Sequence, residues 1–191
     1  EWVASLPGTK VISKGNHDYW WPSNKKIEAI LPPSVHFVNK SAIDIGDFSI
    51  AGTRLWDHRG VDFSPFIDFR PNPRATHPEP KTAEEKEHDE RIYESELQRL
   101  ELALQGLTPG KRKIAMVHYP PLNHDLTASP ASELLEKYGV EICVFGHIHN
   151  LKGGVELFNS KKGGVHYLLT SCDYLAFKPQ LCFSSSSQLI D

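Results

Sequence analysis

The stretch ICVFGHIH at residues 142–149 decides how this sequence folds and what it does. Its first four residues are apolar and β-prone, and after Gly146 two histidines stand two positions apart. Two earlier segments show the same pattern, since GNHD at 15–18 follows the β-prone run 11–13 and His118 ends the run 114–117. Because polar residues at strand ends carry the chemistry of α/β sheets, the sequence predicts an α/β fold with one site assembled from these three segments.

Composition narrows the class of protein. The chain has 191 residues, of which 39% are hydrophobic and 24% charged, which is ordinary for one globular domain. A net charge of -3 disfavours nucleic acid as a partner, so an anionic substrate would depend on local positive charge such as metal ions supply. The apolar runs are too short for a membrane span, and three cysteines without paired spacing indicate a reducing compartment. These features predict a cytoplasmic protein without a membrane partner.

The periodicity of apolar residues predicts the elements between the three segments. We expect a helix over 23–31 capped by Ser23, and then three strands that form a meander with a tight turn at Gly46. An amphipathic helix is expected over 82–107. The strands of the meander are expected at 35–38, 42–45 and 48–52. The remaining expected elements are strands at 113–118 and 141–145, a helix at 129–139, a hairpin of 155–158 with 165–170, a long loop at 57–81 and a frayed tail at 184–191.

The polar residues at these strand ends have the chemistry of a metal site. Two histidines two apart can reach two metal ions from one rigid turn, and Gly146 before them would permit a tight backbone. Asn16 offers a carbonyl oxygen, and His17 can face a substrate as a general acid. Each segment alone also fits an ordinary turn, because Gly-Asn and His-Asp are good turn formers and a lone histidine is often structural. Their joint presence favours the site.

The set GNHD at 15–18, Val117-His118 and GHIH at 146–149 resembles the calcineurin-like metallophosphoesterase superfamily. The neighbouring segments HDYWW at 17–21 and TSCDYL at 170–175 resemble its uncharacterised bacterial branch of phosphohydrolases. This resemblance covers essentially the whole chain.

The resemblance implies a four-layer αββα sandwich with two divalent metal ions, Mn, Fe or Zn, at the strand ends. Asn16, His118 and His147 would bind one metal and His149 the other. A metal-bound hydroxide would attack a phosphate ester, and His17 would protonate the leaving group. Asp18 would orient its loop rather than bind metal.

The resemblance also implies segments that this sequence does not contain. The family has an Asp-x-His and a Gly-Asp segment before its Gly-Asn-His-Asp, and no Asp or His precedes Gly15 here. The expected domain is therefore the C-terminal two-thirds of a metallophosphoesterase, at 1–191, without its first strand-helix units. Three ligands from this chain could still hold one metal, while the bridging charge for two would be absent.

Three other interpretations remain beside the hydrolase. A protein-interaction scaffold on the same fold, or an inactive fragment of it, would show the same motifs. A metallo-β-lactamase-like hydrolase is a weaker interpretation, because the run His-x-His-x-Asp-His is absent.

Two further residues have expected roles. Arg54 could contact substrate or form a structural pair with an aspartate, and Cys143 is expected to be a buried apolar residue. The substrate stays open among phosphate monoesters, diesters, cyclic nucleotides and pyrophosphates.

Overall fold

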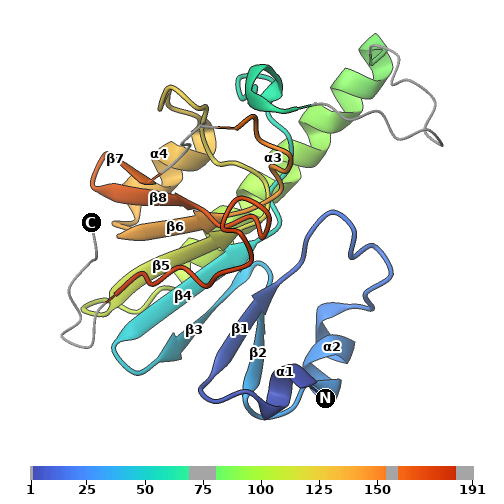
Figure 1. Cartoon of the computed structure of the whole chain (residues 1–191). Helices are drawn as coiled ribbons and strands as arrows, with labels where there is room; N and C mark the ends of the chain where they lie inside the picture. The colour runs from blue at the N-terminus through green and yellow to red at the C-terminus, as the bar shows by residue number, and fades with distance from the viewer. Residues whose placement is uncertain (1, 69–80, 154–158, 184–191) are drawn as a thin grey trace.

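A computed structural model describes residues 2–68, 81–153 and 159–183 of the chain, and it contains two β-sheets (Figure 1). The larger sheet has six strands in the order β3-β4-β5-β6-β8-β7, and the smaller one pairs β1 with β2. The strands are β1 (Lys10–Ser13), β2 (Val35–Val38), β3 (Ser41–Ile45), β4 (Phe48–Thr53), β5 (Arg112–Val117), β6 (Ile142–Phe145), β7 (Asn159–Lys162) and β8 (Val165–Leu169).

Four neighbouring strands of the larger sheet run in the same direction. β4, β5, β6 and β8 pair in parallel, whereas β3 and β7 are antiparallel strands at the two edges. Parallel strands bring their carboxyl ends to one edge of the sheet. The segments that follow β5 and β6, with their histidines, therefore leave the sheet side by side.

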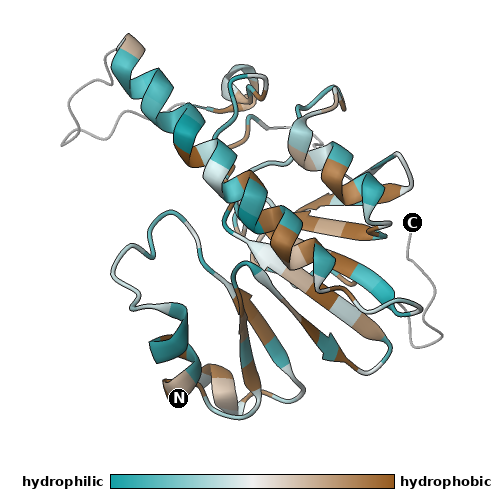
Figure 2. Cartoon of the chain, turned by 180° about the vertical axis from the view of Figure 1, so that it is seen from behind, coloured by the Kyte–Doolittle hydropathy of each residue, from teal (hydrophilic) through white to brown (hydrophobic). Residues whose placement is uncertain are grey.

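Two helices cover one face of this sheet, namely α3 (Ala83–Gln105) and α4 (Pro130–Lys137). Both begin with a capping box, in which Thr82 and Ser129 accept from the backbone of the first turn. Seen from behind, α3 crosses the sheet with mainly hydrophilic residues in its first turns and more hydrophobic ones in its second half (Figure 2). Leu100 and Leu104 of that second half are fully buried against the strands. The predicted helices over 82–107 and 129–139 are confirmed, with shorter bounds.

The smaller sheet corrects the predicted meander. β1 and β2 are parallel and joined through the short helix α2 (Asn24–Ile30), which makes a β-α-β unit, and α1 (Trp2–Ser5) lies at its start. The chain leaves β2 through Lys40, whose φ of 56° is left-handed, and enters the other sheet. β3 then pairs with β4 across the turn at Gly46, as predicted. Periodicity identified the strands, but it carries no information about which of them pair.

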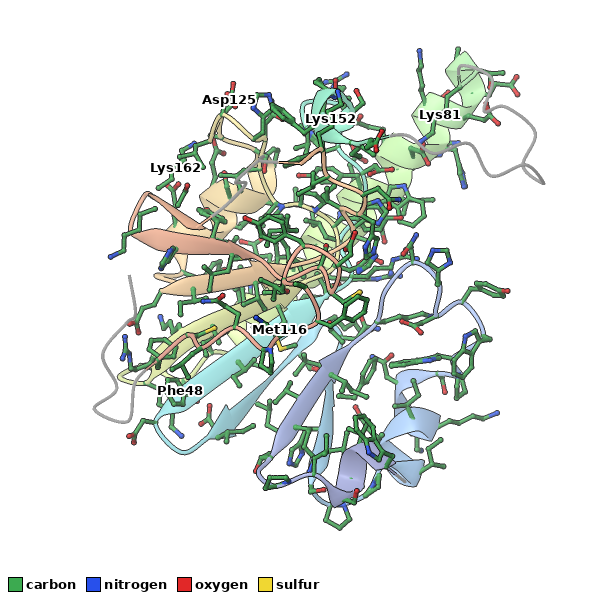
Figure 3. The ribbon with its side chains drawn as sticks, in the orientation of Figure 1. Phe48, Lys81, Met116, Asp125, Lys152 and Lys162 are labelled. Atoms are coloured by element: carbon green, nitrogen blue, oxygen red, sulfur yellow. The ribbon has the colours of Figure 1, made fainter. Side chains whose placement is uncertain are left out.

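The two sheets touch where β2 faces β4. A Cβ at Gly52 would lie 2.7 Å from Cγ2 of Val38 and 2.9 Å from the carbonyl oxygen of Met116, so only glycine fits this contact. Figure 3 shows Met116 of β5 in the middle of the molecule, between the larger sheet and the N-terminal elements. The arrangement of helices outside mostly parallel strands is an α/β fold; the full four-layer sandwich stays a prediction.

Several other expectations can be compared with the structure. Ser23 stands at the N-cap of α2 but makes no side-chain cap hydrogen bond. The described part of the expected long loop, 57–68 and Lys81, contains the short 3-10 helix η1 (Ser64–Phe66) and an isolated β-bridge of Ile67 with Leu151. The expected strand at 155–158, most of the loop at 69–80 and the tail at 184–191 lie outside the described residues. Among the residues described, no helix has the length and apolar character to cross a membrane.

Candidate metal centre

The backbone brings three loops together at the carboxyl edge of the larger sheet. The N–H groups of His118 and Tyr119 both donate to the carbonyl of Arg54, at 3.0 and 3.1 Å, which ties the loop after β5 to the end of β4. Gly146 N–H donates to the carbonyl of His118 at 3.1 Å, which ties the loop after β6 to the loop after β5. These hydrogen bonds continue the sheet register beyond the strands and fix the positions of the histidines.

Gly15 allows the loop after β1 to approach His118. A Cβ at this position would lie 3.2 Å from Cε1 of the His118 ring and 3.3 Å from Oδ2 of Asp18, closer than most side chains tolerate. The carboxylate of Asp18 accepts the Gly15 N–H at 2.8 Å and closes the loop on itself. The next residue, Asn16, is thereby presented to the ring of His118.

Asn16, His118 and His147 converge on one point. Nε2 of His118 lies 2.7 Å from Oδ1 of Asn16 and 3.2 Å from Nδ1 of His147. The three donors come from loops after β1, β5 and β6 and are half-buried. An amide oxygen and two ring nitrogens directed at a common point form an N,N,O donor set, which suits Mn, Fe or Zn.

Burial keeps both histidines of this cluster neutral at pH 7. Desolvation is the largest cause that lowers the pKa of His118 to about 4, and the neighbouring His147 lowers it further. Desolvation also lowers the pKa of His147, against the opposing effect of the Asp57 carboxylate. Since an imidazole binds metal only through an unprotonated nitrogen, this electrostatic setting fits a divalent cation. The residues present therefore fit the metal that the motifs imply.

The turn at residues 146–149 holds its first histidine in an uncommon conformation. His147 has φ of 69°, and the N–H of Ile148 donates to the carbonyl of Gly146 at 2.8 Å. We expected Gly146 to supply the unusual backbone, but the left-handed residue is His147. Left-handed non-glycine residues occur at functional sites when surrounding contacts impose them. The ring of Tyr119, 4.1 Å from that of His147 between centroids, is one such contact.

His149 is directed to a different partner. Its Nδ1 lies 2.7 Å from Oδ1 of Asp173, in the loop after β8. His149, Cys172 and Asp173 place one donor atom each within 4.8 Å of one another, and within the described ranges they are the one such group of His, Cys, Asp and Glu side chains. All three are exposed, unlike the cluster around His118.

His17 follows Asn16 on the same loop and is exposed to solvent. Its positive charge, when present, is among the causes that lower the pKa of His147, so it lies within electrostatic range of the cluster. An exposed imidazole beside the donor set can exchange protons with solvent and with a bound ester.

Arg54 forms a structural pair, although with a glutamate instead of the expected aspartate. Its guanidinium stacks over the ring of Trp56 at 4.4 Å and lies 3.4 Å from Oε1 of Glu96, which is almost completely buried in α3. Oε2 of Glu96 accepts from the buried hydroxyl of Thr53 at 2.8 Å. This network fixes the end of β4, whose carbonyl at Arg54 holds the loop of His118.

A cleft of about 920 Å³ borders the cluster. It lies between the 57–67 segment and the first turns of α3, and His147 is the one ligand candidate that lines it. Lys81, which Figure 3 places at the outer end of α3, is part of its rim and pairs with Asp89 at 2.6 Å. Apolar residues form much of the wall: Val61, Phe63, Ile67, Pro120 and Ile148.

Sequence reasoning missed Asp57, Tyr119 and Asp173 as neighbours of the histidines. Asp173 had a usable signal, because it follows a predicted strand by a few residues, as the histidines do. The other two lie in segments whose approach to His147 depends on the tertiary fold.

The chain belongs to the calcineurin-like phosphoesterase family, whose model matches residues 1–151. Comparisons with curated proteins and with solved structures found no match. Membership implies a phosphoesterase activity, and the family typically binds divalent metals. The protein is thus a hydrolase of the metallophosphoesterase family. The prediction is confirmed at this level, and the bacterial phosphohydrolase branch stays a prediction.

Proposed function

We propose that this protein hydrolyses small phosphate esters with Asn16, His118 and His147 as the ligands of one divalent cation. The observation that carries the proposal is the convergence of Asn16 Oδ1 and His147 Nδ1 on His118 Nε2, at 2.7 and 3.2 Å, from three separate loops. His149, on the same turn as His147, contributes to a second cation. Mn, Fe and Zn all match these donors.

A cation bound there supplies Lewis acidity, which neutralises charge on the phosphoryl oxygens and promotes ionisation of water. The protein's own residues orient the ester and handle the proton. Asn16 and the two neutral histidines would hold the cation in place, and the backbone bonds to Arg54 and His118 keep their loops from shifting. His17 holds a proton in its exposed ring and donates it to the oxygen of the departing alcohol.

The cleft beside His147 accommodates the rest of the substrate. Its volume of about 920 Å³ far exceeds the space that a phosphate needs, and the apolar part of its wall suits an organic leaving group, while charged residues such as Asp62, Lys86 and Glu87 line the rest. We therefore propose an ester of an organic alcohol, as a monoester or a diester, ahead of inorganic pyrophosphate.

The test is hydrolysis of p-nitrophenyl phosphate and bis(p-nitrophenyl) phosphate with added Mn²⁺, compared with EDTA and with the His118→Ala variant. We expect metal-dependent release of p-nitrophenol from at least one ester, and its loss in the variant. A folded protein that binds Mn²⁺ and releases none from either ester would overturn the hydrolase in favour of the interaction scaffold.

A further inference from the structure

A carboxylate outside the family-matched part of the chain contacts the second histidine of the 146–149 turn. The match ends at residue 151, whereas Asp173 lies in the loop after β8. Its Oδ1 is 2.7 Å from Nδ1 of His149, and its Oδ2 accepts the N–H of Asn150 at 2.8 Å. One carboxylate therefore holds both the ring of His149 and the backbone next to it.

The loop that carries this carboxylate is itself fixed to the sheet. The N–H and the hydroxyl of Thr170 both donate to the carbonyl of Phe145, at 2.7 and 3.0 Å, so the loop starts beside the end of β6. Further along, Phe177 N–H donates to the carbonyl of Cys172 at 2.7 Å and closes a compact turn. Ala176 and Phe177 adopt left-handed φ of 50° and 58° to make that turn. The carboxylate is exposed, but it is delivered by a folded loop that fixes its position.

The contact with Asp173 determines which ring nitrogen of His149 carries hydrogen. Both oxygens of this carboxylate face a nitrogen: Oδ2 accepts the N–H of Asn150 at 2.8 Å, and Oδ1 lies 2.7 Å from Nδ1 of His149. A carboxylate accepts hydrogen bonds, so Nδ1 of His149 is the donor in this contact. In the neutral ring, Nε2 then carries the lone pair.

We infer that Asp173 is a positioning residue, which fixes His149 in the Nδ1–H tautomer and directs its Nε2 toward the cation site. Histidines that bind metals commonly donate their other ring N–H to a carboxylate, which sets the tautomer and the ring orientation. The role toward a cation depends on the proposed function. The tautomer does not, because it belongs to the metal-free protein.

In a competing arrangement, Cys172 would bind a cation together with His149 and Asp173. Its sulfur lies within the same 4.8 Å group as the donors of His149 and Asp173, and together they could bind a cation directly. Direct binding through Nδ1 of His149 would require Asp173 to give up the 2.7 Å hydrogen bond. The positioning role predicts that Cys172 has no part in the site.

The first experiment records long-range ¹H–¹⁵N NMR spectra of the histidine rings in the metal-free protein, for the wild type and for Asp173→Ala, Asp173→Asn and Cys172→Ser. We expect the His149 ring as the Nδ1–H tautomer in the wild type and in Cys172→Ser. Asp173→Ala should convert it to Nε2–H or to a mixture, and Asp173→Asn should retain part of the wild-type tautomer through its amide oxygen. Unchanged rings of His118 and His147 show that each variant is folded.

The second experiment titrates Zn²⁺ into the same four proteins and follows the ring nitrogens. Asp173→Ala should require about 10 to 100 times more Zn²⁺ for the His149 response, with the responses of His118 and His147 unchanged. An Nε2–H tautomer in the wild type, or a Cys172→Ser effect as large as that of Asp173→Ala, would overturn the inference. Loss of the His118 and His147 responses in the wild type would instead count against the proposed function, and the tautomer result would stand.

Discussion

Two regions at the same edge of the sheet prepare a histidine for metal in different ways. Around His118, burial makes the rings neutral, and close packing directs Asn16 and His147 at the same nitrogen. At His149 the ring is exposed, and a carboxylate from the loop after β8 fixes it. Desolvation sets the protonation state in the first region, and a hydrogen bond sets the tautomer in the second. The first region should therefore be sensitive to packing, and the second to the charge of one side chain.

Removal of a ring from the buried cluster should have the largest effect. His118→Ala deletes the nitrogen shared by Asn16 and His147, so Mn²⁺ affinity should fall by more than the roughly 100-fold that loss of an outer-sphere partner costs. Hydrolysis should fall to background. Isothermal titration calorimetry measures the affinity, and His88→Ala, at an exposed position on α3, is the matched control. Retained affinity in His118→Ala would remove this cluster from the site.

Loss of the proposed acid should separate chemistry from metal binding. His17→Ala removes an exposed ring that makes no hydrogen bond to the three proposed ligands, so Mn²⁺ affinity should stay within about two-fold, while kcat falls by about 10² to 10⁴. Steady-state kinetics against pH provides the measurement. An ester with a very acidic leaving group should lose less, because it needs no proton. Equal losses for acidic and basic leaving groups would argue against the acid role.

The packing of the buried region can be weakened from a distance. Glu96→Ala leaves the buried Thr53 hydroxyl without its acceptor and Arg54 without its carboxylate, so the free energy of unfolding should fall by about 3 kcal/mol. Because Arg54 holds the His118 loop, Mn²⁺ affinity should weaken as well. Urea denaturation measures the stability. Glu101→Ala, which removes a surface carboxylate paired with Lys137 and bonded to the Tyr138 hydroxyl, should lower the stability far less.

Acid should destabilise the metal-free protein through the same region. The pKa of His118 is about 4 in the fold against about 6.5 in the unfolded chain, so the unfolded state binds more protons between these values. Stability should therefore fall as the pH drops from about 6.5 toward 4, by on the order of 1 kcal/mol, because the rings are only half-buried. Urea midpoints across this range measure it. A His118→Ala variant should show a weaker pH dependence, and an equally steep one would assign the effect to other groups.

The sequence predicted the positions of helices and strands better than it predicted which strands pair. Periodicity and the turn at Gly46 located β3 and β4, but the parallel pairing of β1 with β2 could not be read from either strand. The three segments of the buried cluster were found because each has polar residues directly after an apolar run. Asp173 follows a predicted strand by a few residues, as the histidines do, but that position does not say which residue it contacts. Its contact with His149 depends on β8 lying beside β6, which only the fold reveals.

The most direct measurement is a crystal structure of the protein soaked in Mn²⁺, with anomalous diffraction data to locate the ion. We predict an anomalous peak within coordination distance of Asn16 Oδ1, His118 Nε2 and His147 Nδ1. A crystal with no peak at these atoms at saturating Mn²⁺, or with its only peak between His149, Cys172 and Asp173, would contradict the account.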